Sequence, residues 1–136
     1  MLSPTLTTWR LVLHVLAAAI WVGGQFSLAA VVPTLRRTAP EATGPVAKAF
    51  ARIAWPAFAL LVVTGIWNLV EVDVTTTSTS YQITLFIKIL LAMVSGAAAV
   101  VHQVGHSRIA LAAGGAIGFL AAVGALFLGV LLRTGA

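Results

Sequence analysis

The sequence predicts an all-α membrane protein, a polytopic four-helix bundle that forms a single transmembrane domain over residues 1–136. Hydrophobic residues make up 60% of the chain and charged residues only 8%, whereas roughly a quarter of the residues in a soluble domain are charged. Four apolar runs each reach the length of about 20 residues that a helix needs to cross a hydrocarbon core of about 30 Å. The segments between these runs are short and polar.

Each expected helix is bounded by a polar or proline-rich segment. Residues 33–45 contain three prolines and cannot form one helix, and residues 71–80 are acidic and rich in Thr and Ser. Pro56 is expected to kink or locally open the second helix. A cleaved signal peptide is the alternative for the first run, but that run is too long for a signal core. The expected helices cover residues 9–32, 46–70, 81–104 and 112–132.

The composition excludes several classes of protein. So few charges cannot cover a water-facing surface, which excludes an ordinary soluble enzyme, a nucleic-acid-binding protein and a disordered chain. The absence of cysteine excludes disulfides, iron–sulfur clusters and thiolate metal sites. The sequence offers no paired catalytic carboxylates, no nucleophile triad and no phosphate-binding loop, so a hydrolase or a kinase is also excluded.

The basic residues predict the orientation in the membrane. The first and third connections and the helix ends beside them carry five basic residues, and the opposite side carries two basic and two acidic residues. The positive-inside rule then places both termini outside the cytoplasm. The five are Arg36, Arg37, Lys48, Arg52 and Arg108, and the opposite group is Arg10, Arg133, Glu71 and Asp73.

Two expected helices carry polar residues at helical spacing. Polar and ionisable side chains inside a membrane are costly and usually face a partner or a cavity. At about 100° per residue, the polar residues of the first and third helices each fall on one stripe, so we expect the two stripes to line a common interior. The first stripe is Arg10, His14, Trp21 and Gln25, with Gly24 close by, and the other is Tyr81, Thr84, Lys88, Ser95, His102 and His106.

His14 and Lys88 are expected at the same depth. His14 lies five residues after Trp9 and Lys88 lies seven after Tyr81, which gives depths of roughly 8 and 10 Å at 1.5 Å per residue. His102 lies near the cytoplasmic mouth. Each residue also has a structural interpretation, because Lys88, His102 and His106 can extend toward the headgroups and Trp21 can be a packing residue.

Two cofactors fit these residues. Haem b or a related porphyrin needs one or two imidazoles and apolar walls, so His14 is the candidate axial ligand, with Trp21 and Gly24 beside the macrocycle. Lys88 is the candidate catalytic residue, as partner of a propionate or as proton donor. Copper is the alternative, with His14 at one end and His102 and His106 at the other, the latter pair at i, i+4 spacing.

The fourth expected helix contains no polar residue between Ala112 and Leu132 but has small residues four apart. Such residues let helices approach closely, so the glycine face is expected to pack inside the bundle. The alternative is a docking face for a homo-oligomer or a larger membrane complex, in which this chain is a non-catalytic accessory subunit. The small residues are Gly114, Gly118, Ala121, Ala125 and Gly129.

The order and spacing of three motifs resemble known bacterial membrane proteins. LHVLAAAIWVGG holds His14, Trp21 and Gly24, WPAFALLVVTGIW holds Pro56, Gly65 and Trp67, and FIKILL holds Lys88, with His102 fourteen residues later. Together they resemble the copper-resistance protein D (CopD) superfamily and the HemJ family of protoporphyrinogen oxidases. The likeness covers about residues 13–102.

The resemblance implies a small four-helix protein of the bacterial inner (plasma) membrane. CopD-like membership implies copper handling, and HemJ-like membership implies porphyrin binding and an oxidation, with the first-helix histidine and third-helix lysine as functional residues. These positions correspond to His14 and Lys88. The stretch QFSLAAVVPTLRR lacks the histidines of HemJ-like chains, so the resemblance does not extend to protoporphyrinogen oxidation itself, and the Ala-rich texture of the chain with VVHQ is nearer the CopD-like branch. The two polar stripes, the matched depth of His14 and Lys88 and the lack of soft copper ligands favour a haem-binding bundle. A haem-dependent membrane oxidoreductase with a porphyrin or an electron-transfer protein as partner is the activity that this hypothesis includes.

Overall fold

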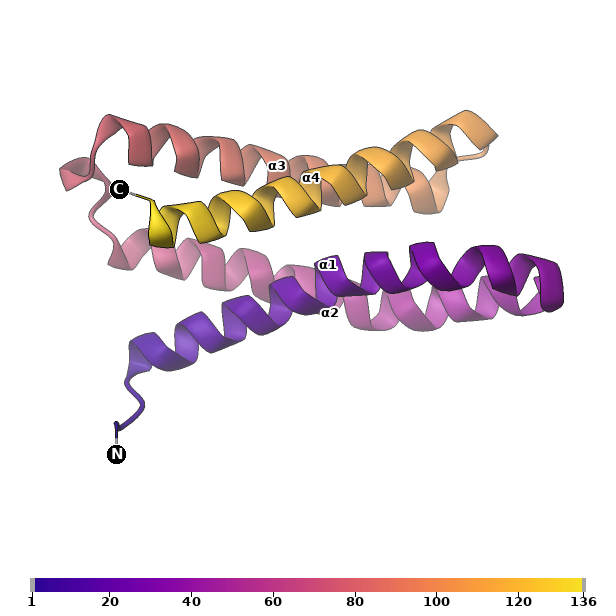
Figure 1. Cartoon of the computed structure of the whole chain (residues 1–136), viewed down its shortest axis with the longest axis horizontal. Coiled ribbons are helices and arrows are strands. Elements are labelled where there is room, and N and C mark those ends of the chain that lie inside the picture. Colours follow the sequence, from indigo (N-terminus) through magenta and orange to yellow (C-terminus); the bar gives the residue numbers. More distant parts are fainter. Residues whose placement is uncertain (1, 136) are drawn as a thin grey trace. The chain divides into compact units, whose positions relative to one another are not determined.

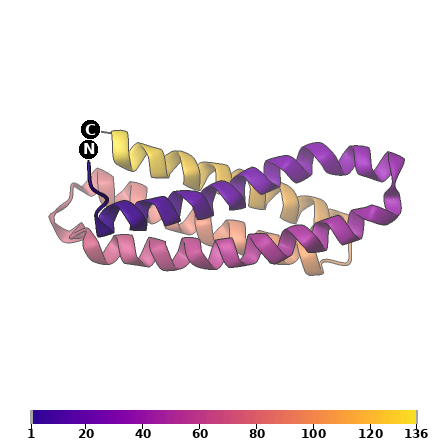
Figure 2. The same ribbon diagram turned by 90° about the horizontal axis from the view of Figure 1, so that it is seen from below.

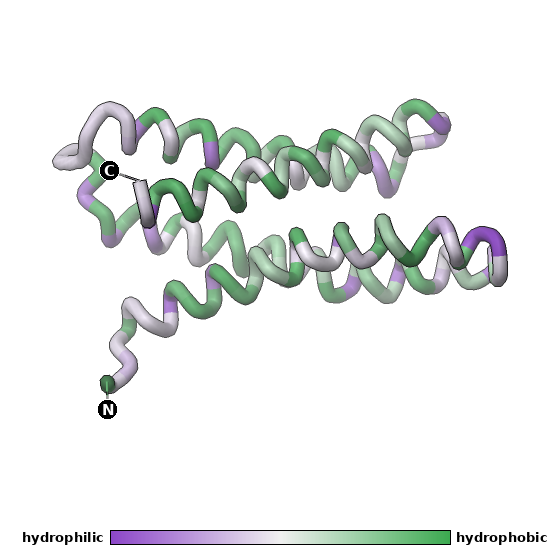
Figure 3. Tube along the Cα trace, in the orientation of Figure 1, coloured by the Kyte–Doolittle hydropathy of each residue, from purple (hydrophilic) through white to green (hydrophobic). Residues whose placement is uncertain are grey.

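The computed structural model describes residues 2–135, and these form four long helices and no strand. All four helices are long and apolar enough to cross a membrane, which confirms the expected fold class. Figure 3 shows the apolar character along most of each helix and a hydrophilic segment at the first helix-to-helix connection. The helices are α1 (Leu6–Thr38), α2 (Thr43–Glu71), α3 (Thr79–Val104) and α4 (Arg108–Thr134).

Hydroxyl side chains begin three of the helices. At the start of α1, the Thr5 side chain accepts a hydrogen bond from the backbone N–H of Thr8, and the Thr8 side chain accepts one from the N–H of Thr5. Ser78 and Ser107 cap α3 and α4 by accepting a hydrogen bond from the backbone N–H of Tyr81 and of Ala110. Each cap satisfies backbone N–H groups that have no partner within the helix, which fixes where the helix starts.

The connection between α1 and α2 is shorter than the sequence predicts. α1 continues through Pro33 to Thr38, and only Ala39 and a short 3-10 turn (Pro40–Ala42) separate it from α2. Pro45 lies in the first turn of α2, where its missing N–H has no helical acceptor to lose. The apolar run predicts the membrane-crossing part of α1, and the helix itself extends beyond that part.

The chain divides into two compact units, Met1–Val72 and Asp73–Ala136. Each unit is a hairpin of two long helices, with α1 running antiparallel to α2 and α3 antiparallel to α4 (Figure 1). Figure 2 shows the same pairs side by side from a second direction. A 3-10 turn at Val74–Thr76 lies at the start of the second unit.

The two hairpins pack in different ways. In the first, Trp21 is 4% exposed and its ring meets Trp55 and Phe58 of α2 at centroid distances of 5.5 and 4.5 Å. In the second, Gly114 and Gly118 of α4 lie against the backbone of α3. The first hairpin is therefore held by aromatic contacts, and the second by close approach of two backbones.

Candidate functional site

His14 makes a polar contact that joins the two helices of the first hairpin. Its Nδ1 lies 2.8 Å from Oγ1 of Thr64 on α2, and Thr64 is only 1% exposed. The ring also packs against Gly65, since a Cβ at that glycine would lie 3.7 Å from Cε1 of His14. The imidazole is thus fixed by a hydrogen bond and a van der Waals contact to α2.

The Thr64 hydroxyl determines which nitrogen of His14 carries the proton. A hydroxyl has one hydrogen, and the Thr64 hydroxyl donates it to the backbone carbonyl of Leu60 at 2.7 Å. Toward His14 the oxygen therefore acts as acceptor, and Nδ1–H of the histidine is the donor. In the neutral ring this tautomer gives Nε2 the lone pair, which is the arrangement required of a histidine that ligates a metal through Nε2.

A charged group lies one helical turn away from His14 on the same stripe. Arg10 is 7% exposed, its guanidinium nitrogen Nη1 is 3.4 Å from a carboxylate oxygen of Glu71, and its Cζ lies 5.9 Å from the centroid of the Trp67 ring. Trp67 donates to the same carboxylate at 3.3 Å. The pairing lowers the cost of burying Arg10 near the end of the hairpin.

Sequence reasoning did not identify Thr64, Trp67 and Glu71 as site residues. They are spaced by three and four residues, so they form a stripe on α2 opposite the first-helix stripe. The polar stripe of α1 therefore faces its own hairpin partner. The same periodicity test, applied to the second apolar run, could have identified them.

Two predicted cofactor-binding residues serve as packing residues in this hairpin. Trp21 is surrounded by Trp55 and Phe58, as described above. Gly24 faces the Phe50 ring of α2, and a Cβ at Gly24 would overlap that ring. The space beside Gly24 is therefore filled by a side chain of this protein.

Lys88 lies in the second hairpin, half-buried against α4. A Cβ at Gly129 would lie 3.4 Å from both Cε and Nζ of Lys88, so this glycine leaves room for the lysine end. Within residues 2–135, Lys88 forms no ion pair and no hydrogen bond through its side chain. The pairing of Lys88 with His14 remains a prediction, because the two residues belong to different units.

His102 and His106 do not share a helical stripe, which corrects the i, i+4 prediction. α3 ends at Val104, and Gly105 has an extended backbone (φ −64°, ψ 139°), so His106 lies in the turn. His102 donates from Nδ1 to the backbone carbonyl of Leu111 at 2.6 Å, and its ring lies over Gly115. Both histidines are exposed near the α3–α4 turn, but helical geometry does not bring them together.

The metal-ligating side chains of the described residues lie apart from one another. Residues 2–135 bring together no three His, Cys, Asp or Glu side chains that could hold a metal ion. A bare copper ion needs several protein ligands, whereas a haem iron already has four ring nitrogens and needs one or two imidazoles. His14 is a single oriented imidazole, which is the number of protein ligands that a haem iron requires at least.

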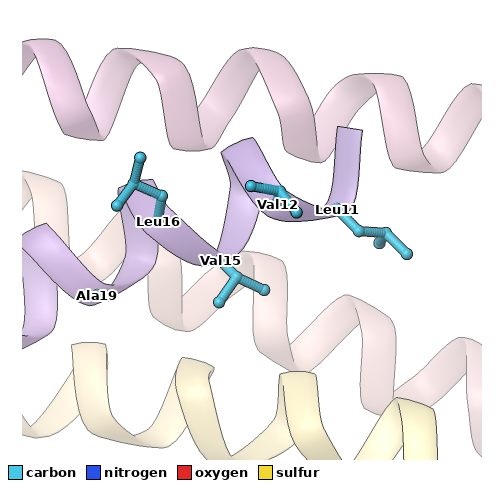
Figure 4. Close-up of a pocket in the computed structure, with 5 residues that line it drawn as sticks. All are labelled: Leu11, Val12, Val15, Leu16 and Ala19. Atoms are coloured by element: carbon cyan, nitrogen blue, oxygen red, sulfur yellow. The ribbon is translucent and has the colours of Figure 1, made fainter. Parts of the chain in front are cut away.

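A surface hollow on the first hairpin contains none of the predicted site residues. It is an open, wholly apolar stretch of α1 (Figure 4). Helical spacing places it on the side of α1 away from the polar stripe. Such a surface suits acyl chains. It is lined by Leu11, Val12, Val15, Leu16 and Ala19.

Comparisons with known protein families, with curated proteins and with solved structures found no match to this chain.

Proposed function

We propose that this chain is a multi-pass membrane protein that binds haem b, or a related porphyrin, through Nε2 of His14 and serves a redox role. The observation that carries the proposal is the hydrogen bond from Nδ1 of His14 to Thr64. Histidines that ligate metals usually donate the other ring N–H to a fixed acceptor, which sets the tautomer and raises the basicity of the ligating nitrogen.

The residues of each hairpin have distinct proposed tasks. His14 holds the iron, Thr64 orients the imidazole, and the Trp21 cluster keeps α1 and α2 in register. Lys88 is the proposed charged partner of a porphyrin carboxylate, since no acidic residue lies inside the apolar runs to neutralise it. A haem bound there would supply one-electron redox chemistry.

The location we propose is a bacterial inner membrane, with both termini outside the cytoplasm. The support is the asymmetry of charge: the connected end of the first hairpin carries Arg36, Arg37, Lys48 and Arg52, and the connected end of the second carries Arg108. At the other end of the first hairpin, Arg10 is compensated by Glu71. This distribution favours the cytoplasm for the connected ends.

Titration of the detergent-purified protein with haem, followed by the Soret absorbance, tests the proposal. We expect saturable binding by the wild type and a loss of at least tenfold in affinity for His14→Ala. His102→Ala is the matched control, because it removes an exposed imidazole from the other hairpin and should leave the affinity unchanged. Circular dichroism of each variant checks that the helices are intact.

Two results would contradict haem binding by this chain. One is a wild type that gives no saturable Soret change. The other is tight binding of Cu(I) without any haem binding, which would favour copper transport or tolerance as the function. Equal haem affinity in the wild type and His14→Ala would remove His14 as the ligand.

A further inference from the structure

The connected end of the first hairpin carries an uncompensated cluster of positive charge. Four basic side chains and one acidic side chain, Glu41, lie in the last turn of α1, in the connection and in the first ten residues of α2. The net charge of this end is 4 − 1 = +3. All four basic residues are exposed, and within residues 2–135 none takes part in an ion pair. They are Arg36, Arg37, Lys48 and Arg52.

Helix lengths place these charges at the level of lipid headgroups. Glu71 marks the opposite end of α2 and is 19 residues from Arg52, a distance of about 28 Å along the helix. This is close to the hydrocarbon thickness of about 30 Å, so Arg52 lies near the second boundary and Lys48 one turn beyond it. Arg36 and Arg37 lie about 40 Å from Arg10 along α1, on the aqueous side of the same headgroup layer.

The surface around Lys48 and Arg52 also suits a lipid. Lys48 and Arg52 are four residues apart, so they share one face of α2. Exposed apolar residues continue the same face of α2 beyond Arg52, at Pro56 and Ala59, four and seven residues further along the helix. Basic groups at the boundary next to exposed apolar groups match the two parts of a phospholipid, its phosphate and its acyl chains.

We propose that the connected end of the first hairpin binds anionic phospholipid headgroups, through Lys48 and Arg52 at the hydrocarbon boundary and Arg36 and Arg37 above it. The charge excess selects an anionic lipid such as phosphatidylglycerol over zwitterionic phosphatidylcholine. The other end of this hairpin has no such excess of positive charge, because Arg10 is paired with Glu71 there. This proposal does not depend on haem binding.

Lipid co-purification tests the proposal on the full chain. The protein is reconstituted into vesicles of equal parts phosphatidylglycerol and phosphatidylcholine, extracted in mild detergent, and its retained lipids are counted by native mass spectrometry. We expect at least threefold enrichment of phosphatidylglycerol for the wild type, since each basic group near an anionic surface favours it by roughly fivefold. The double variant Lys48→Gln/Arg52→Gln should bring the ratio of retained phosphatidylglycerol to phosphatidylcholine back toward that of the vesicles.

Matched variants separate charge from folding. Lys48→Arg/Arg52→Lys keeps the charge and should retain the enrichment. Arg133→Gln removes a basic residue from the last turn of α4 and should also retain it. Extraction in 1 M NaCl should weaken the enrichment, because the Debye length falls to about 3 Å.

The proposal is overturned if the wild type retains the two lipids in the vesicle ratio, the result expected if this end instead binds an acidic protein. It is also overturned if Lys48→Gln/Arg52→Gln keeps the full enrichment, or if Arg133→Gln loses as much as that double variant.

Discussion

At the scale of single residues, the chemistry of the first hairpin depends on a histidine and a threonine that lie 50 positions apart in the chain. Thr64 is fully buried and anchored to its own helix through Leu60, so its oxygen is a fixed acceptor for His14. Fixing the acceptor fixes the tautomer, and the tautomer decides which nitrogen can ligate iron. The role proposed for His14 therefore depends on Thr64.

Thr64→Val tests this dependence, because valine has nearly the shape of threonine but cannot accept a hydrogen bond. We expect haem affinity to fall by about 10- to 100-fold, the usual effect of removing the acceptor behind a metal-ligating histidine. Thr64→Ser keeps the hydroxyl and should bind within a few-fold of the wild type. Equal affinities for Thr64→Val and the wild type would show that the tautomer is set in another way.

Adjacent glycines give a second test at the residue scale. A Cβ at Gly24 would overlap the Phe50 ring, whereas a Cβ at Gly23 would meet nothing within 4 Å. We expect Gly24→Ala to lower the free energy of unfolding by about 1–3 kcal/mol, as overpacking does, and Gly23→Ala to change it by less than about 0.5 kcal/mol. Unfolding in mixed detergent micelles measures both, and equal losses would contradict the assigned packing.

At the scale of elements, the small residues of α4 have one clear use. Gly114 and Gly118 face α3, and Ser95 of α3 donates to the backbone carbonyl of Gly118 at 2.9 Å. The glycine face was expected to pack inside the structure, and α3 does cover Gly114 and Gly118 within the hairpin.

Two alanine substitutions in α4 should differ in cost. A Cβ at Gly114 would lie 2.9 Å from the carbonyl oxygen of Ala98 and from the backbone nitrogen of His102, and backbone atoms cannot rotate away. At Gly118 the nearest atoms are at 3.4 Å. We expect losses of about 2–3 kcal/mol for Gly114→Ala and less than about 1 kcal/mol for Gly118→Ala. Unfolding titrations that gave the reverse order would refute this account of the α3–α4 contact.

The helices were predictable from the sequence because length and hydropathy are local properties. The polar stripe of α1 was predictable for the same reason, since it depends on spacing alone. Contacts across the hairpin were not, because they depend on the register of α1 against α2. Thr64 carries no charge and looks like an ordinary helical threonine, so only the fold identifies it as the partner of His14.

Two further residues show which structural features spacing alone does not predict. A small residue near a polar stripe leaves space, but spacing does not indicate what fills it, and Phe50 fills the space at Gly24. Periodicity also assumes that the helix continues, and Gly105 ends α3 before His106.

At the scale of the whole molecule, four membrane spans place both termini on the same side, which we expect to be outside the cytoplasm. The chain contains no cysteine, so single cysteines report location without interference. With a membrane-impermeant maleimide on intact cells, we expect labelling of Ser3→Cys and Ser80→Cys, and labelling of Glu41→Cys only after the membrane is opened. The opposite labelling pattern would show that both termini lie in the cytoplasm.

Ligation of a haem iron by His14, oriented by Thr64, is tested by an absorption spectrum of the protein purified from membranes, oxidised and then reduced with dithionite. We expect a Soret band in the wild type that shifts on reduction, is lost in His14→Ala and is weakened or shifted in Thr64→Val. A wild type that is colourless and stays colourless after haem addition would contradict it.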